Sequence, residues 1–189
     1  MSSISRLALR ARSIRRFDTS QRVDYDLLLQ FIDNARMASS ARNGQTLKYL
    51  PIVDAPTCDK VFATLKFAAY LTDWHGPAED ERPAAYIIVL HDASLGPLFP
   101  VDAGLATQNI VLSAAEVGLG CCIVGAVDKQ KLAETIGRQY ETVHVIAIGR
   151  PAEQVVIEPM QGGDIKYWRD AQGTHHVPKR SLDEIVVKL

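Results

Sequence analysis

Apolar side chains recur at helical spacing between Val101 and Gly120. Pro100 and Asp102 are start signals for a helix, and Gly118 and Gly120 are stop signals. The polar positions form only a narrow stripe, which consists of Asn109, Ser113 and Glu116. A helix that is apolar around most of its circumference is usually buried on several sides. The pattern predicts either a core helix or a helix packed against a second copy of itself, which its many Ala and Gly residues would allow.

Shorter apolar patterns alternate along the rest of the chain. Helices are predicted over residues 3–11, 24–37, 57–67 and 128–136. Strands are predicted over residues 49–53, 84–90, 121–124 and 144–148. The segment 84–90 is entirely apolar, as is typical of a central strand buried on both faces. Strands that alternate with helices indicate an α/β or α+β sandwich.

Two polar segments interrupt these elements. Residues 38–47 carry small hydroxyl and amide side chains, which either cap the next element or bind the polar edge of a planar ligand. Residues 70–82 contain Trp74, His75 and four acids, which suggests a surface loop that acts as a lid.

The last 38 residues, 152–189, show no helix-sized periodic segment before the final turn. Their apolar residues need a surface to bury against, and a tail of this length does not easily cover its own domain. We therefore predict one domain over residues 1–189, in which residues 152–189 form an arm over a partner subunit.

Composition excludes several classes of protein. A net charge of -1 gives no general attraction to nucleic acid, and no apolar run has the 18 or more residues of a membrane span. The three cysteines are odd in number and two are adjacent, which argues against a disulfide framework and favours a cytoplasmic setting. Residues 1–17 are rich in Arg and Ser and have no acid, so a transit peptide is the alternative for this segment.

Common catalytic motifs are absent from the sequence, which has no P-loop, no G-x-G-x-x-G after a strand and no G-x-S-x-G. His175 and His176 raise the possibility of a metal site, but adjacent histidines on regular structure do not face one site, and we predict no metal. Cys121 and Cys122 lie in an apolar strand and are predicted to be packing residues. A bound cofactor is therefore the natural source of any chemistry.

The arginines at 12, 15 and 16 are forked donors suited to phosphate or carboxylate, with a solvated basic face as the alternative. The segment Arg12–Phe17 resembles the R-x-S-x-R opening of the FMN-dependent nitroreductase family, and residues 38–45 resemble its A-P-S-A-x-N-x-Q segment. Residues 102–120 are similar to the central helix of that family, and residues 146–151 to its last core strand and exit turn. Residues 164–169 and 175–184 are similar to the ending of a subgroup of small members.

The resemblance implies a homodimeric α+β sandwich, with a mixed or antiparallel sheet flanked by helices and one FMN in each interface pocket. It implies that Arg12 and Arg15, with Lys179 or Arg180, hold the FMN phosphate. The ribityl hydroxyls and the polar edge of the ring would contact Ser13, Ser40, Asn43 and Gln45. The backbone at Gly125 and Ala126 would lie against flavin N5 and O4, and no side chain is predicted to be catalytic.

The same resemblance implies hydride transfer from NADH or NADPH to flavin N5, then reduction of a nitroaromatic or quinone in the same pocket by a ping-pong mechanism. Two alternatives stay open at this point. One is a flavin-binding carrier or sensor without turnover, and the other is a flavin-destroying or reductive dehalogenating relative on the same fold. The partners implied are a second copy of the chain and a small-molecule acceptor, with no nucleic acid and no membrane.

The sequence departs from the family pattern at three places. The family often has Arg at the position of Ala11, Pro at that of Ser39, and Pro-Trp or Pro-Leu at Thr46-Leu47. Loss of the two prolines gives the 38–47 loop more freedom in the unfolded chain, which lowers the free energy of unfolding by roughly 0.4–1 kcal/mol for each proline. Flavin affinity is the property that these changes put in doubt.

Overall fold

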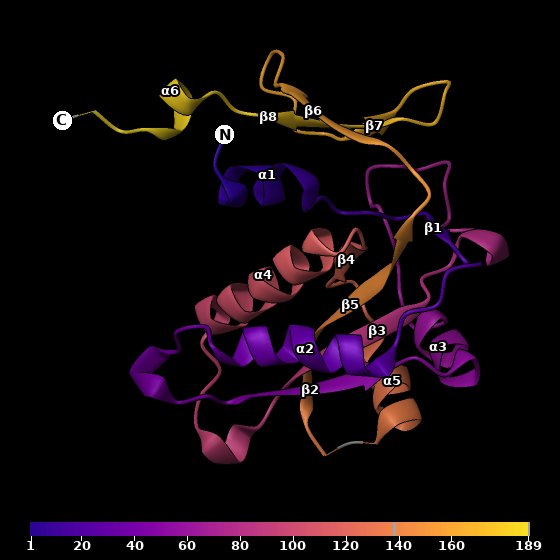
Figure 1. The fold of residues 1–189 in the computed structure, drawn as a ribbon, viewed down its shortest axis with the longest axis vertical. Coiled ribbons are helices and arrows are strands. Elements are labelled where there is room, and N and C mark those ends of the chain that lie inside the picture. Colours follow the sequence, from indigo (N-terminus) through magenta and orange to yellow (C-terminus); the bar gives the residue numbers. More distant parts are fainter. Residues whose placement is uncertain (138, 189) are drawn as a thin grey trace.

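An antiparallel sheet of five strands forms the centre of the computed structural model, which describes residues 1–137 and 139–188 (Figure 1). The strands are β1 (Phe17–Asp18), β2 (Leu47–Ile52), β3 (Ala85–His91), β4 (Gly120–Val124) and β5 (Glu141–Pro151). Strand β3 lies between β2 and β5, and β5 also pairs with β4 and β1. The long strand β5 therefore pairs with three of the other four strands.

Helices cover both faces of this sheet. Successive side chains of a strand point to opposite faces, and in β3 Ile87 and Val89 join one buried cluster while Tyr86 and Ile88 join another. The first cluster includes residues of α2 (Tyr25–Arg36) and α4 (Pro100–Glu116), and the second includes residues of α3 (Ala55–Phe62) and α5 (Lys129–Ile136). This sandwich confirms the prediction of an α+β class.

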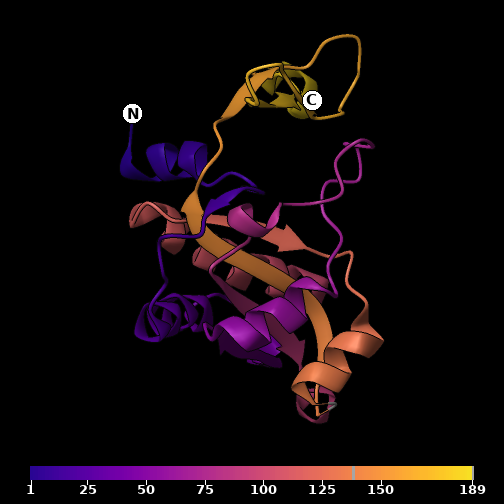
Figure 2. The same cartoon turned by 90° about the vertical axis from the view of Figure 1, so that its right-hand side faces the viewer.

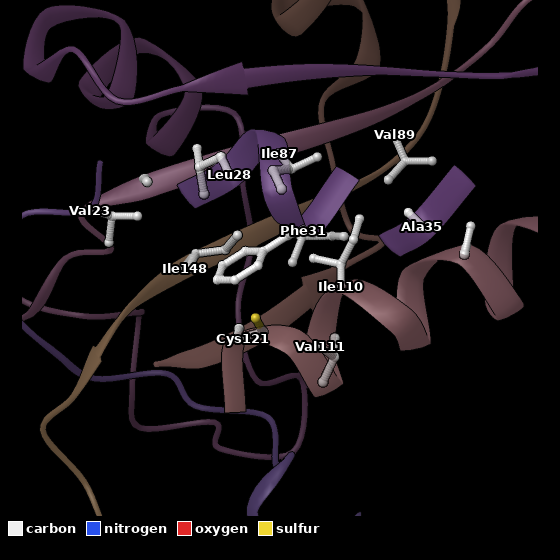
Figure 3. Packing of buried hydrophobic residues seen from close by; sticks show 14 residues of the cluster. Val23, Leu28, Phe31, Ala35, Ile87, Val89, Ile110, Val111, Cys121 and Ile148 are labelled. Carbon is white, nitrogen blue, oxygen red and sulfur yellow. The ribbon is translucent and has the colours of Figure 1, made fainter. Parts of the chain in front are cut away.

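The packing of α2 against α4 and the sheet is dense. Figure 3 shows Phe31 of α2 beside Ile110 of α4 and Ile148 of β5, and all three side chains are almost completely buried. Burying an aliphatic or phenyl side chain stabilises the fold by about 1.5–3 kcal/mol. This contact fixes α4 on the sheet. The loop between α2 and β2 and the N-terminal arginine segment, both described below, lie beside the two ends of α4.

Helix α4 is not buried on all sides in one chain. Ala103, Ala106, Ile110 and Ala114 are buried, as their helical spacing predicted, whereas Val117, predicted on the same line, is 50% exposed. Val101 and Leu105, however, are 62% and 45% exposed. A Cβ added to Gly104, which lies between them, would meet no atom within 4 Å. The helix therefore presents an open apolar strip to solvent.

Several helices and strands begin or end at residues other than those predicted. Strand β2 begins at Leu47, which the sequence had placed in a loop, and β5 extends over residues 141–151 in place of 144–148. Helix α3 begins two residues before its predicted start at residue 57, because Asp54 accepts the N–H of Thr57 and caps the helix itself. That helix ends at Phe62, and the chain then turns toward Leu65, which bridges to Val127.

The C-terminal arm contains regular structure that periodicity did not predict. Strands β6 (Val155–Pro159), β7 (Trp168–Arg169) and β8 (His175–Lys179) form a small second sheet, followed by helix α6 (Leu182–Ile185). Figures 1 and 2 both show this sheet beyond the end of β5, on the side where the N-terminal helix α1 (Ser3–Arg10) lies. Packing of the arm on a partner subunit stays a prediction.

Throughout residues 1–137 and 139–188, we find no helix that combines the length and the apolar character needed to cross a membrane.

The predicted surface loop at residues 70–82 has no strand, and a single 3-10 turn at Glu79–Glu81 is its only helical part.

Candidate functional site

The N-terminal arginine segment lies along strand β4. The N–H of Ile14 donates to the carbonyl of Cys121 over 2.8 Å, and Ser13 forms a bridge with the same residue. Ile14 is buried and packs on Gly120, where no side chain larger than hydrogen fits. Because Ile14 points inward, the side chains of its neighbours Ser13 and Arg15 are left on the outer side of the segment.

Gly125 and Ala126 follow the other end of β4. The carbonyl of Ala126 accepts the N–H of Lys66 over 2.9 Å, and the N–H of Asp128 donates to the carbonyl of Thr64 over 2.8 Å. Neither Gly125 nor Ala126 donates its own N–H to any acceptor in the part of the chain that the structure describes. The turn is therefore held in place while two backbone donors stay available to a ligand.

One open cavity of about 570 Å³ connects these two segments. This volume lies in the usual range of cofactor and ligand sites. The cavity is lined by Arg15, Phe67, Trp74, Gly125, Ala126 and Tyr167, among others. Trp74 and His75 of the predicted lid are lining residues, whereas Asp73 is not among them. Aromatic rings with one guanidinium and two free N–H groups suit a planar ligand that carries negative charge.

The C-terminal arm closes over Arg15. The Arg15 guanidinium donates to Nε2 of His175 over 3.1 Å and lies 4.6 Å from the centre of the Tyr167 ring. The carboxylate of Glu153 accepts the backbone N–H of Arg15 and also pairs with Arg169 over 2.8 Å. Arg169 in turn stacks on Trp74 of the loop. The arm, the loop and the N-terminal segment therefore meet at Arg15.

This cluster has a surplus of unused donors. Burial, then the nearby charges of Arg15, Arg169 and His176, lowers the pKa of His175 to about 4, so its ring is neutral at pH 7. Its Nε2 accepts from Arg15, which leaves the proton on Nδ1. Among the described residues, that Nδ1 and the Nε atoms of Arg15 and Arg169 are buried without a hydrogen-bond partner. The Nε of Arg12 is also buried and unpaired, but Arg12 lines a separate hollow with Ile14 and Ala115. Unpaired buried N–H groups in a cationic cluster fit an anionic group such as a phosphate.

Ser40, Asn43 and Gln45 form a second group on the loop between α2 and β2. The N–H of Gln45 donates to Oγ of Ser40 over 3.3 Å, and the Gln45 amide donates to the carbonyl of Asn43 over 3.2 Å. This loop is tied to the first turn of α4, because the N–H of Ala41 donates to both carboxylate oxygens of Asp102. A small cavity of about 160 Å³ lies beside Ser40 and Gln45.

The two groups lie at opposite ends of α4 (Figure 1). Ser40 and Gln45 are beside its first turn, whereas Arg12 and Ile14 line a hollow with Ala115 just before its C-terminal end. A helix of this length spans about 25 Å. One chain therefore does not bring the predicted ring-edge residues and the predicted phosphate residues into one pocket.

Lys179 and Arg180 lie at the end of the arm. Arg180 pairs with Glu184 over 3.5 Å, and the Lys179 carbonyl accepts the N–H of Met160. Within the described residues, no hydrogen bond or ion pair joins either of them to Arg12 or Arg15. Their part in phosphate binding stays a prediction, and His175 is the arm residue in contact with Arg15.

The two adjacent histidines face different partners, as expected for neighbours on a strand. His175 contacts Arg15, whereas His176 stacks on Trp168 and lies between the carboxylates of Glu158 and Asp170. Sequence reasoning considered this pair only for a metal and missed the contact with Arg15. In the residues that the structure describes, no three potential ligands are grouped for a metal ion.

The cysteines of β4 serve in packing. Cys121 and Cys122 are buried on opposite faces of the sheet, and burial raises the pKa of Cys122 to about 11. A thiol that stays protonated at neutral pH is a poor nucleophile. Cys122, which lines the cavity, is therefore not expected to act as a nucleophile there.

The helix-flanked antiparallel sheet is shared with solved structures of nitroreductase family proteins. Residues 67–150 match the sequence model of the Nitroreductase family. The match confirms the resemblance found in the sequence for residues 67–150. The matched region contains Trp74, Gly125 and Ala126, whereas Arg12, Arg15 and the arm lie outside it.

Individual relatives extend the likeness to the whole chain. YdgI of Bacillus subtilis (strain 168), provisionally named an NAD(P)H nitroreductase, is 24% identical over 182 residues, which cover 76% of this chain and 86% of that protein. The crystal structure of a nitroreductase family protein from Streptococcus pneumoniae TIGR4 has a TM-score of 0.70 at 16% identity and covers 99% of this chain and 100% of its own. A protein from Exiguobacterium sibiricum 255-15, provisionally named a nitroreductase and solved in complex with FMN, has a TM-score of 0.63 at 19% identity, over 80% of this chain and 90% of its own.

Proposed function

We propose that this protein is an FMN-dependent oxidoreductase that takes hydride from NADH or NADPH and reduces a nitroaromatic, a quinone or a similar small acceptor by a ping-pong mechanism. The observation that carries the proposal is the cavity with Arg15 at one side and the two unused N–H groups of Gly125 and Ala126 at the other. The name of the Bacillus subtilis relative and the FMN complex of the Exiguobacterium sibiricum neighbour support it.

The side chains present fit an FMN molecule. Arg12 and Arg15 would hold the phosphate, for which their unpaired Nε atoms provide donors, and Ser13 would contact the ribityl chain. The N–H groups of Gly125 and Ala126 would donate to the polar edge of the ring and favour negative charge there. When bound, FMN would supply the redox chemistry.

The other half of the pocket would come from a second copy of the chain. The exposed strip of Val101, Gly104 and Leu105 on α4 is apolar and free of obstruction, so a second α4 could pack on it. If the two helices run antiparallel about a two-fold axis, the Ser40–Gln45 loop of each chain meets the arginine end of its partner. Two equivalent sites would result, each with residues from both subunits.

The purified protein is expected to show flavin absorbance, and that absorbance should bleach under anaerobic conditions on addition of NADH or NADPH. The cavity is open to solvent, so a nicotinamide could reach a flavin bound there. A later addition of a quinone should restore the absorbance. A flavin that resists both nicotinamides would contradict the reductase proposal and favour a carrier or sensor, and a protein without any flavin affinity would contradict FMN binding itself.

A shared site can be tested by mixing two inactive variants. Arg15→Ala damages the arginine end and Gln45→Ala damages the loop end, so each homodimer carries one defect in both of its sites. After subunit exchange, half of the sites in every mixed dimer are intact, and about a quarter of all sites should regain flavin binding and reductase activity. Mixing two samples of Arg15→Ala is the matched control. No recovery in mixtures that contain mixed dimers by native mass spectrometry would contradict the shared site.

A further inference from the structure

The loop that carries Ser40, Asn43 and Gln45 has an unusual backbone. Arg42, Asn43 and Gln45 have φ angles of 56°, 55° and 49°, in the left-handed region. Side chains with a Cβ rarely adopt this region, which glycine adopts freely. The one glycine of the loop does not relieve it, because Gly44 has a φ of -69°. The surrounding structure must therefore hold this conformation against the preference of the residues themselves.

Contacts at both ends of the loop supply that restraint. At its end, the N–H of Asp92 donates to the carbonyl of Thr46 over 2.9 Å. At its start, the N–H of Ala41 lies 3.0 Å from both carboxylate oxygens of Asp102. Asp102 comes from another element, the first turn of α4, and is only 5% exposed. A hydrogen bond to a buried carboxylate is stronger than one between neutral groups.

Asp102 does more than favour the start of its helix. An acidic side chain in the first turn interacts well with the helix dipole even when it points into solvent. Here the carboxylate is buried and aimed at a segment 61 residues away in the sequence. Asp102 lines the same small cavity as Ser40 and Gln45, two of the predicted ring-edge residues.

We propose that Asp102 is a positioning residue for the flavin site: its carboxylate anchors Ala41 and thereby keeps the strained 40–45 loop in the one conformation that presents Ser40, Asn43 and Gln45 to the cofactor. This inference rests on the proposed function. Asp102 does not need to contact the flavin directly. The anchor acts through the loop backbone, so its loss should loosen the loop and weaken cofactor binding together.

The first test needs no cofactor. Arg42 is exposed within the loop and is a trypsin site, and cleavage there requires the loop to open. Cleavage after Arg42, followed by mass spectrometry on the cofactor-free protein, should be about tenfold faster in Asp102→Ala than in the wild type. Glu116→Ala removes an exposed acid from the same helix and is the matched control, with no expected change. If Asp102→Ala does not fold, Asp102→Asn serves instead, with a smaller increase because the amide oxygen still accepts.

The second test asks whether the anchor matters to the flavin. Asp102→Ala should raise the dissociation constant for FMN about tenfold in a fluorescence titration, while Asp102→Asn should raise it less. Arg42→Gly removes the strain at one left-handed position without removing a described contact, so adding it to Asp102→Ala should recover part of the affinity. If Asp102→Ala weakened FMN binding by damaging the fold elsewhere, a substitution at Arg42 would not restore the affinity.

The outcomes separate the two proposals. Unchanged cleavage in the Asp102 variants would overturn the anchoring role. Faster cleavage with unchanged FMN affinity, or no recovery on adding Arg42→Gly, would overturn the positioning role. If the wild type itself binds no FMN, the proposed function fails and the flavin part of this inference fails with it, while the cleavage rates still decide whether Asp102 holds the loop.

Discussion

The double variant Arg12→Ala/Arg15→Ala should bind FMN about 100-fold more weakly than the wild type, or lose it completely. Each charge-assisted hydrogen bond to a phosphate contributes about 1.5–3 kcal/mol, and about 1.4 kcal/mol corresponds to a factor of ten. The unpaired Nε atoms of both arginines are the structural basis of this expectation. The measurement is a fluorescence titration with FMN, together with the flavin content after gel filtration.

Two controls separate phosphate binding from other effects of these arginines. Arg6→Ala removes an exposed guanidinium group from α1, away from the hollow that Arg12 lines, and should leave FMN affinity unchanged. Arg15→Lys keeps the positive charge but loses the planar fork that contacts Tyr167 and His175, so an intermediate affinity is expected. Full retention of flavin by the double alanine variant would refute the assignment of the phosphate site.

The substitution Gly120→Ala should lower the free energy of unfolding by about 2–3 kcal/mol, a typical cost of overpacking. A Cβ at this position would lie 2.5 Å from Cγ1 and 2.9 Å from Cβ of Ile14, and 3.0 Å from Cγ of Pro151. Ile14 is branched at Cβ and cannot rotate away easily. Because Ile14 fixes the arginine segment on β4, we expect weaker FMN binding as well as lower stability.

Gly125→Ala is the matched control for stability, since a Cβ there would meet no atom within 4 Å. Chemical denaturation of the cofactor-free protein, followed by circular dichroism, should show a lower midpoint for Gly120→Ala and an unchanged midpoint for Gly125→Ala. Equal midpoints for Gly120→Ala and the wild type would mean that the segment around Ile14 moves away at little cost.

Local patterns predicted the core well because the core obeys local rules. The apolar run at residues 84–90 became the central strand β3, and the spacing of Ala103, Ala106, Ile110 and Ala114 predicted the buried face of α4. The cap at Asp128 was also predicted, since an aspartate before a helix accepts the N–H of the third residue along.

The contacts that build the site are not visible in any local pattern. His175 meets Arg15 over a separation of 160 residues, and Asp102 meets Ala41 over 61. The small sheet of the arm was missed because strands of two to five residues carry too few alternating positions to produce a periodic signal. The resemblance to a family proposed residues for the cofactor, but only the three-dimensional structure separated them into two groups.

The position of β5 near the end of the chain has a consequence for how the protein reaches its folded state. Strands β2 and β3 can pair early, whereas β4 and β1 both need β5 as their partner. Phe17 pairs with Pro151. The N-terminal segment therefore cannot pair until the ribosome has added a residue more than a hundred positions later in the chain. Contacts so distant in sequence form slowly. We therefore expect the arginines, although they are synthesised first, to be among the last residues to reach their places.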